Sequence, residues 1–168
     1  STTGELVAWI KTDISSTTDT TLYMYYGNSG AGDQATTTGV WDANYVAVWH
    51  MNEDGTGTRF DSTGKNNFAT ENYDDNEATT GQIAGADDLD GGGDRLGAGS
   101  SASLDITQDL TMEMWVKADG FSGSPDILTK GTYGEAYTVW ASTGGNLRFG
   151  LNGNELNSIG ALGTTGWE

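Results

Sequence analysis

A polar stretch from His50 to Asn67 holds most of the residues that could do chemistry, and it reads HMNEDGTGTRFDSTGKNN. It carries three carboxylates, three glycines and three asparagines in eighteen residues. Ca²⁺ takes roughly six to eight oxygen ligands from such side chains and from backbone carbonyls. Gly64 would let the backbone turn its carbonyls toward one point. The alternative is an Asx-turn, in which Asp61 accepts a hydrogen bond from the backbone two residues on.

Other site chemistries find little support in the sequence. His50 is the only histidine and the chain has no cysteine, so a zinc site lacks its usual ligands. No G-x-S-x-G elbow is present to place a nucleophilic serine beside that histidine. We therefore interpret His50 as a structural residue, either buried and hydrogen-bonded or exposed.

The composition narrows the class of protein. Seven basic residues stand against 24 acidic ones in 168 residues, a net charge of −17, which would repel the phosphates of a nucleic acid. The sequence contains no run of roughly 18 apolar residues, so it predicts no segment that inserts into a membrane. Six Trp, seven Tyr and four Phe argue against disorder, because these side chains bury the most surface each.

Short alternating runs separated by Gly, Asn, Asp, Ser and Thr predict antiparallel strands. The clearest runs are residues 5–11, 20–26, 45–51, 110–117, 127–129, 136–141 and 146–151. The last two are joined by STGG, a hairpin signal that would place Val139 and Ala141 near Leu147 and Phe149. This spacing of strands and turns predicts an all-β fold, an antiparallel sandwich or jelly roll.

Four motifs carry a resemblance to a known superfamily. In order they are VWHMNED, FDSTGKNN, GQIAGADDLDGGGDRL and SASLDITQDLTMEMWVKAD. Residues 45–168 resemble the laminin-G-like, concanavalin A-like lectin/glucanase superfamily, which implies a β-sandwich, here expected to be truncated at its C-terminus. Residues 1–44, with YMYYGN, resemble the C-terminal half of a β-rich domain of unknown function from bacterial and archaeal surface proteins.

The resemblance implies a structural calcium ion near the opening loop. On this basis the metal candidates are Asp61 first, then Asn67 and Asn66, with Glu53 last. The acidic run from Asp87 to Asp94 is a second possible cation site, but we interpret it as a strand and a turn. Asp87 also departs from the resemblance, because relatives carry an inward-pointing apolar residue there.

The resemblance also bears on activity. The glucanases of the superfamily hold their carboxylates on one strand as E-x-D-x-E or E-x-D-x-x-E, and this pattern is absent. We therefore expect no enzyme. Aromatic rings stack on the apolar faces of sugars, and the hairpin-like segments offer candidates for such a face. The carbohydrate-binding candidates are Tyr133, Tyr137, Trp140 and Asn146.

The sequence thus predicts a non-catalytic carbohydrate-binding or adhesion module of an extracellular or cell-surface protein, stabilised by calcium. Its expected partners are a polysaccharide or glycan, and other copies or the rest of the same surface protein. The alternative is a structural subunit or spacer of a surface assembly or filament without glycan binding.

Overall fold

The computed structural model describes residues 6–53, 57–72, 78–91, 93–131 and 136–168. Its strands pair antiparallel throughout the described residues, and α1 (Thr37–Val40) is a single helical turn. The chain divides into two compact units, Ser1–Gly99 and Ser100–Glu168. In the described part of the chain no helix is long and apolar enough to cross a membrane.

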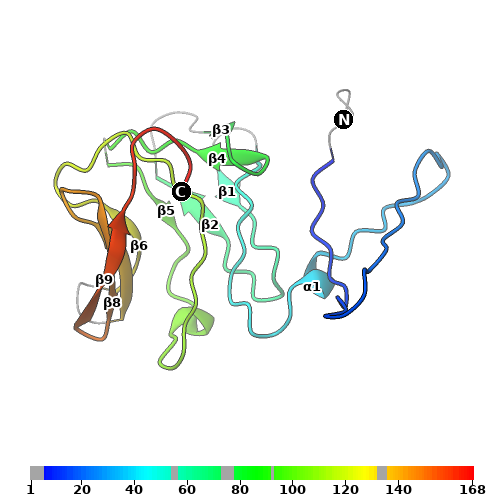
Figure 1. The fold of residues 1–168 in the computed structure, drawn as a ribbon, viewed down its shortest axis with the longest axis horizontal. Helices are drawn as coiled ribbons and strands as arrows, with labels where there is room; N and C mark the ends of the chain where they lie inside the picture. The colour runs from blue at the N-terminus through cyan, green and yellow to red at the C-terminus, as the bar shows by residue number, and fades with distance from the viewer. Residues whose placement is uncertain (1–5, 54–56, 73–77, 92, 132–135) are drawn as a thin grey trace. The chain divides into compact units, whose positions relative to one another are not determined.

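The first unit holds five short strands in two small sheets (Figure 1). The three-stranded sheet has the order β1-β2-β5, and a hairpin pairs β3 with β4. Its strands are β1 (Thr58–Arg59), β2 (Ala69–Glu71), β3 (Ala78–Thr80), β4 (Gly85–Asp87) and β5 (Leu96–Gly97). Strands of two or three residues bury little apolar surface. Hydrogen bonds and ion pairs must therefore contribute much of the stability of this unit.

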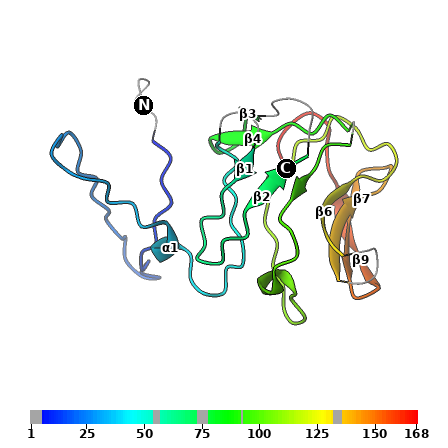
Figure 2. The ribbon, with the colours of Figure 1, turned by 180° about the vertical axis from the view of Figure 1, so that it is seen from behind.

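The second unit is a four-stranded meander with the order β6-β7-β8-β9 (Figure 2). After the 3₁₀ turn η1 (Ala102–Leu104) it comprises β6 (Asp126–Lys130), β7 (Tyr137–Ala141), β8 (Asn146–Leu151) and β9 (Asn154–Ala161). Three of the predicted runs fall on β6, β7 and β8. The predicted neighbours are confirmed, because Val139 pairs with Phe149 and Ala141 pairs with Leu147.

Four predicted strands are not strands in the structure. Residues 6–11, 20–26 and 110–117 carry no strand assignment, and in 45–51 only Trp49 makes an isolated bridge, to Asp61. Alternation of apolar and polar residues indicates which side chains face inward. A β-strand also requires backbone hydrogen bonds to a neighbouring strand, which the alternation does not predict. In 110–117 the alternation of burial is partial, since Leu110, Met112 and Val116 are half-buried but Met114 is exposed. The end of the run exchanges two backbone hydrogen bonds between Val116 and Glu168.

The core of the second unit lies on β7. Tyr137 is buried, and its hydroxyl donates a hydrogen bond of 2.9 Å to the carbonyl of Leu104. Burial raises the pKa of Tyr137, and the charge of Asp105 raises it further. Trp140 and Ala141 are also buried. The antiparallel, all-β part of the fold prediction is confirmed in the described residues.

The hairpin between β7 and β8 depends on a glycine. Gly145 has a φ of +78°, its N–H donates to Ser142 at 2.8 Å, and its carbonyl accepts from Leu162. A Cβ there would lie 2.8 Å from the carbonyl oxygen of Leu162 and 2.9 Å from the ring of Phe121. The position therefore excludes a side chain both by backbone conformation and by space.

We expect Gly145→Ala to lower the free energy of unfolding by about 1–3 kcal/mol, the cost of a left-handed non-glycine residue. Urea denaturation followed by tryptophan fluorescence would measure the change. Gly144→Ala is the matched control, because Gly144 has no positive φ and a Cβ there would lie 3.4 Å from the amide of Asn146. Equal losses in the two variants would contradict this account of the turn.

Candidate functional site

The carboxylate of Asp61 organises the polar loop that follows His50. Its Oδ1 accepts hydrogen bonds from the N–H groups of Val48 (3.0 Å) and Thr63 (2.9 Å). Its Oδ2 accepts from the Thr63 hydroxyl and from the Asn67 N–H, both at 2.8 Å. Asp61 itself is only 7% exposed. One buried side chain thus satisfies donors from the run that precedes the loop (Val48) and from two positions within the loop (Thr63 and Asn67).

Asn67 extends this network. The side-chain amide of Asn67 donates to the backbone carbonyl of Val46 at 2.7 Å. The backbone carbonyl of Asn67 accepts a hydrogen bond from the indole N–H of Trp49 at 2.8 Å. Asn67 is 2% exposed, so both of its amide contacts are shielded from water. The strand-like run before the loop and the end of the loop are therefore tied together by Asp61 and Asn67.

The contact between Asp61 and the Thr63 N–H is the Asx-turn that the sequence left open. Burial raises the pKa of Asp61, but the hydrogen bonds from Thr63, Val48 and Asn67 outweigh it and hold the pKa below its ordinary value. Within the described part of the loop, the non-glycine residues with a positive φ are Met51 (+53°) and Asn66 (+57°), whereas Gly64, the expected turning point, has no positive φ. Asparagine tolerates this conformation better than other non-glycine residues.

The metal candidates do not form one cluster. Asp61 and Asn67 meet, but both carboxylate oxygens of Asp61 already accept hydrogen bonds from N–H and O–H groups. Asn66 is exposed, and Glu53 Oε1 accepts from the Phe60 N–H at 2.7 Å. No group of three or more His, Cys, Asp or Glu suited to a metal occurs among the described residues. Calcium binding stays a prediction.

A buried ion-pair cluster lies beside this loop. Arg59 is 1% exposed, and its guanidinium holds Asp87 through both Nε (2.9 and 3.0 Å) and a terminal nitrogen (2.6 Å). The same nitrogen lies 3.4 Å from Glu71 Oε2, and both carboxylates are more than nine-tenths buried. The resemblance predicts an inward-pointing apolar residue at position 87. In the structure the Asp87 side chain is buried there and pairs with Arg59.

His50 packs against aromatic rings. The ring of Trp9 stacks on it at 5.0 Å with an interplanar angle of 22°, and Trp41 lies 5.9 Å away. Burial lowers the pKa of His50, while the charge of Glu53 raises it in part. The ring therefore holds the N-terminal segment against the loop, in agreement with a structural reading.

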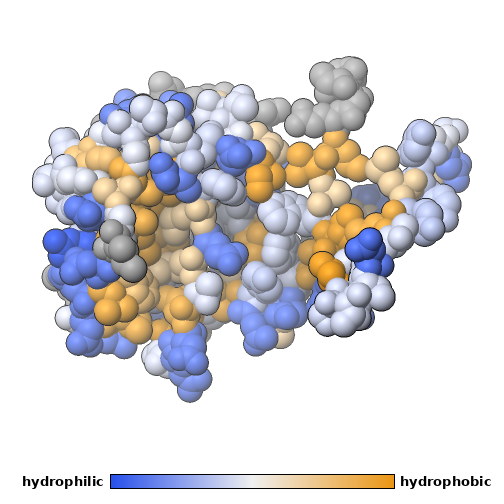
Figure 3. Space-filling model, in the orientation of Figure 1, coloured by the Kyte–Doolittle hydropathy of each residue, from blue (hydrophilic) through white to orange (hydrophobic). Residues whose placement is uncertain are grey.

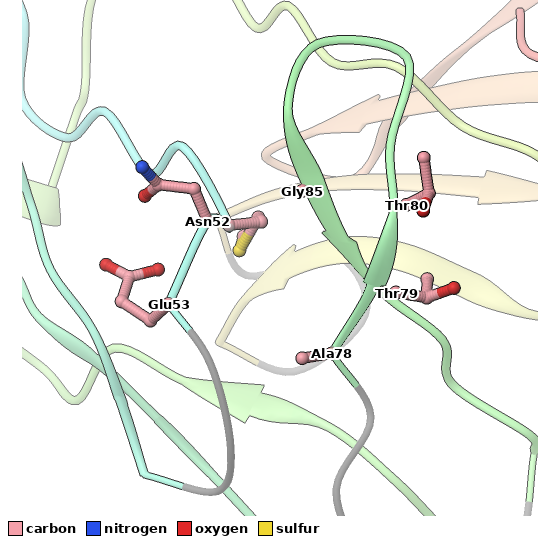
Figure 4. A pocket seen from close by; sticks show the side chains of 7 residues that line it. Asn52, Glu53, Ala78, Thr79, Thr80 and Gly85 are labelled. Carbon is pink, nitrogen blue, oxygen red and sulfur yellow. The ribbon is translucent and has the colours of Figure 1, made fainter. Parts of the chain in front are cut away.

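A pocket of about 420 Å³ lies between the segment 51–53 and the β3–β4 hairpin. Gly85 admits the backbone of Met51 and Asn52 at close range, where a Cβ would collide. Figure 4 shows the carboxylate of Glu53 directed away from the hairpin that carries Thr79 and Thr80, so these polar groups do not converge in this view. Glu53 Oε2 is buried and has no hydrogen-bond partner among the residues that the structure describes.

The predicted carbohydrate-binding residues lie in different environments. Tyr133 lies outside the described residues. Tyr137 and Trp140 are buried in the core of the four-stranded sheet, at 6% and 9% exposed. Asn146, at the start of β8, is exposed. Two of the four candidates, Tyr137 and Trp140, are therefore packed in the core and do not face solvent.

An exposed aromatic pair was missed by sequence reasoning. Phe60 and Phe68 flank the β1–β2 ladder, lie edge to face with ring centroids 5.5 Å apart, and are 57% and 41% exposed. Residues alternate across these strands, so the rings share the outer face with the cross-strand pair Thr58 and Thr70. The signal was this alternation around Asp61, hidden in a stretch read as one polar loop.

No family model, no curated protein and no solved structure matches this chain.

The pKa of Asp61 gives a prediction for acid stability. Because its folded pKa lies below the ordinary value of 3.8, the unfolded chain binds this proton more tightly. The contribution is complete above pH 3.8 and is lost as pH falls through the folded pKa. We expect Asp61→Asn to cost about 1.5–3 kcal/mol at neutral pH and to flatten this part of the stability profile. Denaturant midpoints measured from neutral to acid pH would check it, with Asp88→Asn, an exposed aspartate of the same unit, as control.

The buried arginine gives a second prediction. Arg59→Met would leave two buried carboxylates without their cation, and we expect a loss of about 3–5 kcal/mol. The double variant Arg59→Met/Asp87→Leu should recover part of this loss. Arg148→Met is the control, because Arg148 pairs with Glu155 where both side chains are about one-third exposed, and should cost at most about 1 kcal/mol. Chemical denaturation of the four proteins would measure these differences, and equal losses for the two arginines would contradict the assignment.

Proposed function

We propose that this chain is a non-catalytic carbohydrate-binding or adhesion module of an extracellular or cell-surface protein. The observation that carries the proposal is the exposed pair Phe60 and Phe68 on the outer face of β1 and β2. Aromatic rings provide apolar faces for the C–H groups of a sugar ring, and exposed rings of this size are costly without a ligand or partner.

Neighbouring polar groups suit a sugar as well. Thr58 and Thr70 form the next cross-strand pair on the face that carries the two rings, and Thr70 is exposed. A hydroxyl can both donate and accept, which matches the hydroxyl groups of a pyranose. Two rings followed by two hydroxyls would therefore bind one or two sugar units of a chain.

The rings are mounted on fixed backbone. Phe60 precedes Asp61, and its N–H is held by Glu53, while Phe68 follows the buried Asn67. Binding then costs little ordering of the protein, because the side chains project from a loop that internal hydrogen bonds already hold.

The fold that we propose for residues 45–168 is the concanavalin A-like β-sandwich implied by the resemblance, with residues 1–44 as part of a second β-rich domain. The antiparallel meander of the second unit supports an all-β fold of this kind. The acidic surface and the absence of cysteine are compatible with an extracellular place.

Calcium is a separate part of the proposal. Among its four candidate residues, Glu53 has the carboxylate oxygen that is left without a hydrogen bond, whereas both oxygens of Asp61 are engaged. A rise of the melting temperature in calcium that is absent in Glu53→Gln would support calcium at Glu53, because a ligand of the native state alone must stabilise it. No rise in the wild-type protein would remove calcium from the proposal.

A glycan and polysaccharide array, run in calcium and again in EDTA, tests the binding function. We expect binding that falls about tenfold or more in Phe60→Ala/Phe68→Ala, a loss of about 1.4 kcal/mol or more. Trp115→Ala is the control, because this ring is 54% exposed but lies in the other unit. Loss of binding in EDTA alone would add calcium to the site.

Absence of binding by the folded wild-type protein in both buffers would contradict the proposal. The remaining candidate would then be the structural subunit or spacer of a surface assembly. Equal weakening by the Trp115 variant would instead place the binding face elsewhere on the molecule.

A further inference from the structure

The N-terminal segment exposes more apolar surface than its unit requires. Ten large apolar side chains between Leu6 and Tyr26 are 45% to 92% exposed. They are Leu6, Val7, Trp9, Ile10, Ile14, Leu22, Tyr23, Met24, Tyr25 and Tyr26. Figure 3 shows apolar residues gathered over the part of this segment that leads from the N-terminus toward α1. Trp9 is anchored on Trp41 and His50, whereas residues 22–26 have no ring contact in the described structure.

The area is that of an interface. At roughly 150–250 Å² for each fully exposed aromatic side chain, these residues present on the order of 1,000 Å² of apolar surface. The largest apolar patch of a typical monomer is about 300–600 Å², and each side of a standard protein–protein interface buries about 800 Å². Summed over the segment, this apolar surface exceeds the largest patch of a typical monomer, and five of the ten side chains that supply it lie in residues 22–26.

Charge favours a second copy as the occupant. Two copies that each carry −17 repel one another over most of their surface. From Leu6 to Tyr26 the charged residues are Lys11, Asp13 and Asp19 alone, a net charge of −1, and residues 20–26 carry none. The apolar segment is thus a place where two such chains can meet with little repulsion.

The backbone of this segment is also free to pair. Residues 6–26 include no strand in the described structure, and no backbone–backbone hydrogen bond joins any of them to another described residue. Residues 20–26 read TTLYMYY, which is rich in residues that favour strands, and they lack only a partner. A short turn, with the Ala31 N–H donating to Asn28, follows them directly.

We propose that residues 22–26 pair antiparallel with the same residues of a second copy, about a two-fold axis at Met24. This register places Leu22 opposite Tyr26 and Tyr23 opposite Tyr25 of the other copy. Four tyrosines then share one face, and two copies of Leu22, Met24 and Tyr26 share the other. A two-fold antiparallel pair is self-complementary, so one segment supplies both sides of the interface.

Sedimentation equilibrium over roughly a hundredfold range of concentration tests the dimer by mass action. We expect the wild-type chain to dimerise, and to do so more strongly in high salt, which screens the repulsion between the copies. Met24→Pro removes a backbone donor and Tyr23→Asp/Tyr25→Asp adds charge, so both should be monomers. Phe60→Asp/Phe68→Asp is the matched control, because it changes two exposed rings in the same way outside the segment.

Disulfide trapping tests the register. The chain has no cysteine, so any disulfide reports an introduced residue. In the proposed pairing the two copies of residue 24 face each other at about 4.5–5.5 Å between Cα atoms, within disulfide reach. The two copies of residue 22 lie roughly 13 Å apart along the strands. We expect Met24→Cys to form a covalent dimer under mild oxidation and Leu22→Cys to remain reduced.

A wild-type chain that stays monomeric at every concentration and salt would overturn the proposal and leave the segment to a different polypeptide. A dimer that survives both Met24→Pro and the tyrosine substitutions would place the interface elsewhere. Equal trapping of the two cysteine variants would overturn the register. Circular dichroism of each variant separates loss of pairing from loss of fold.

Discussion

In the first unit, the backbone N–H groups of Val48, Thr63 and Asn67 converge on the carboxylate of Asp61. These donors are buried where water cannot satisfy them, and an unpaired buried donor costs about 1–3 kcal/mol. Because both carboxylate oxygens are shared, moving any one of these segments would break contacts of the others. The position of Trp49, the turn at Asn66 and the outward direction of Phe60 and Phe68 all follow from this one acceptor.

The two units reach stability by different means. The first has strands of two or three residues, and its interior is fixed by a carboxylate hub and by an arginine with two acidic partners. The second relies on longer hairpins with Tyr137, Trp140 and Ala141 at the centre. A chain with 35% hydrophobic residues and 26 glycines can thus order itself by directional polar contacts where apolar area is scarce.

The local sequence pattern was sufficient to predict the β7–β8 hairpin of the second unit, but it was insufficient to predict the structure of the first unit. The β7–β8 hairpin could be predicted with its register, since alternation and the STGG turn lie within a short stretch of chain. The pairing of Arg59 with Asp87 joins residues 28 apart, and no local pattern reports it. Asp61 and Asn67 could be selected as important, but whether they receive N–H donors or offer oxygens to a cation depends on the folded backbone. Phe60 and Phe68 were overlooked because their strands are too short to show a period.

The buried arginine constrains how this sequence can change over evolutionary time. Replacing Asp87 by the apolar residue expected from the resemblance would leave Arg59 paired with Glu71 alone, and replacing Arg59 first would strand two carboxylates. Each single step therefore passes through a less stable protein, whereas both together do not. In a collection of descendants of this chain, positions 59 and 87 should change in the same lineages, and their covariation would record a contact that neither position reveals when read separately.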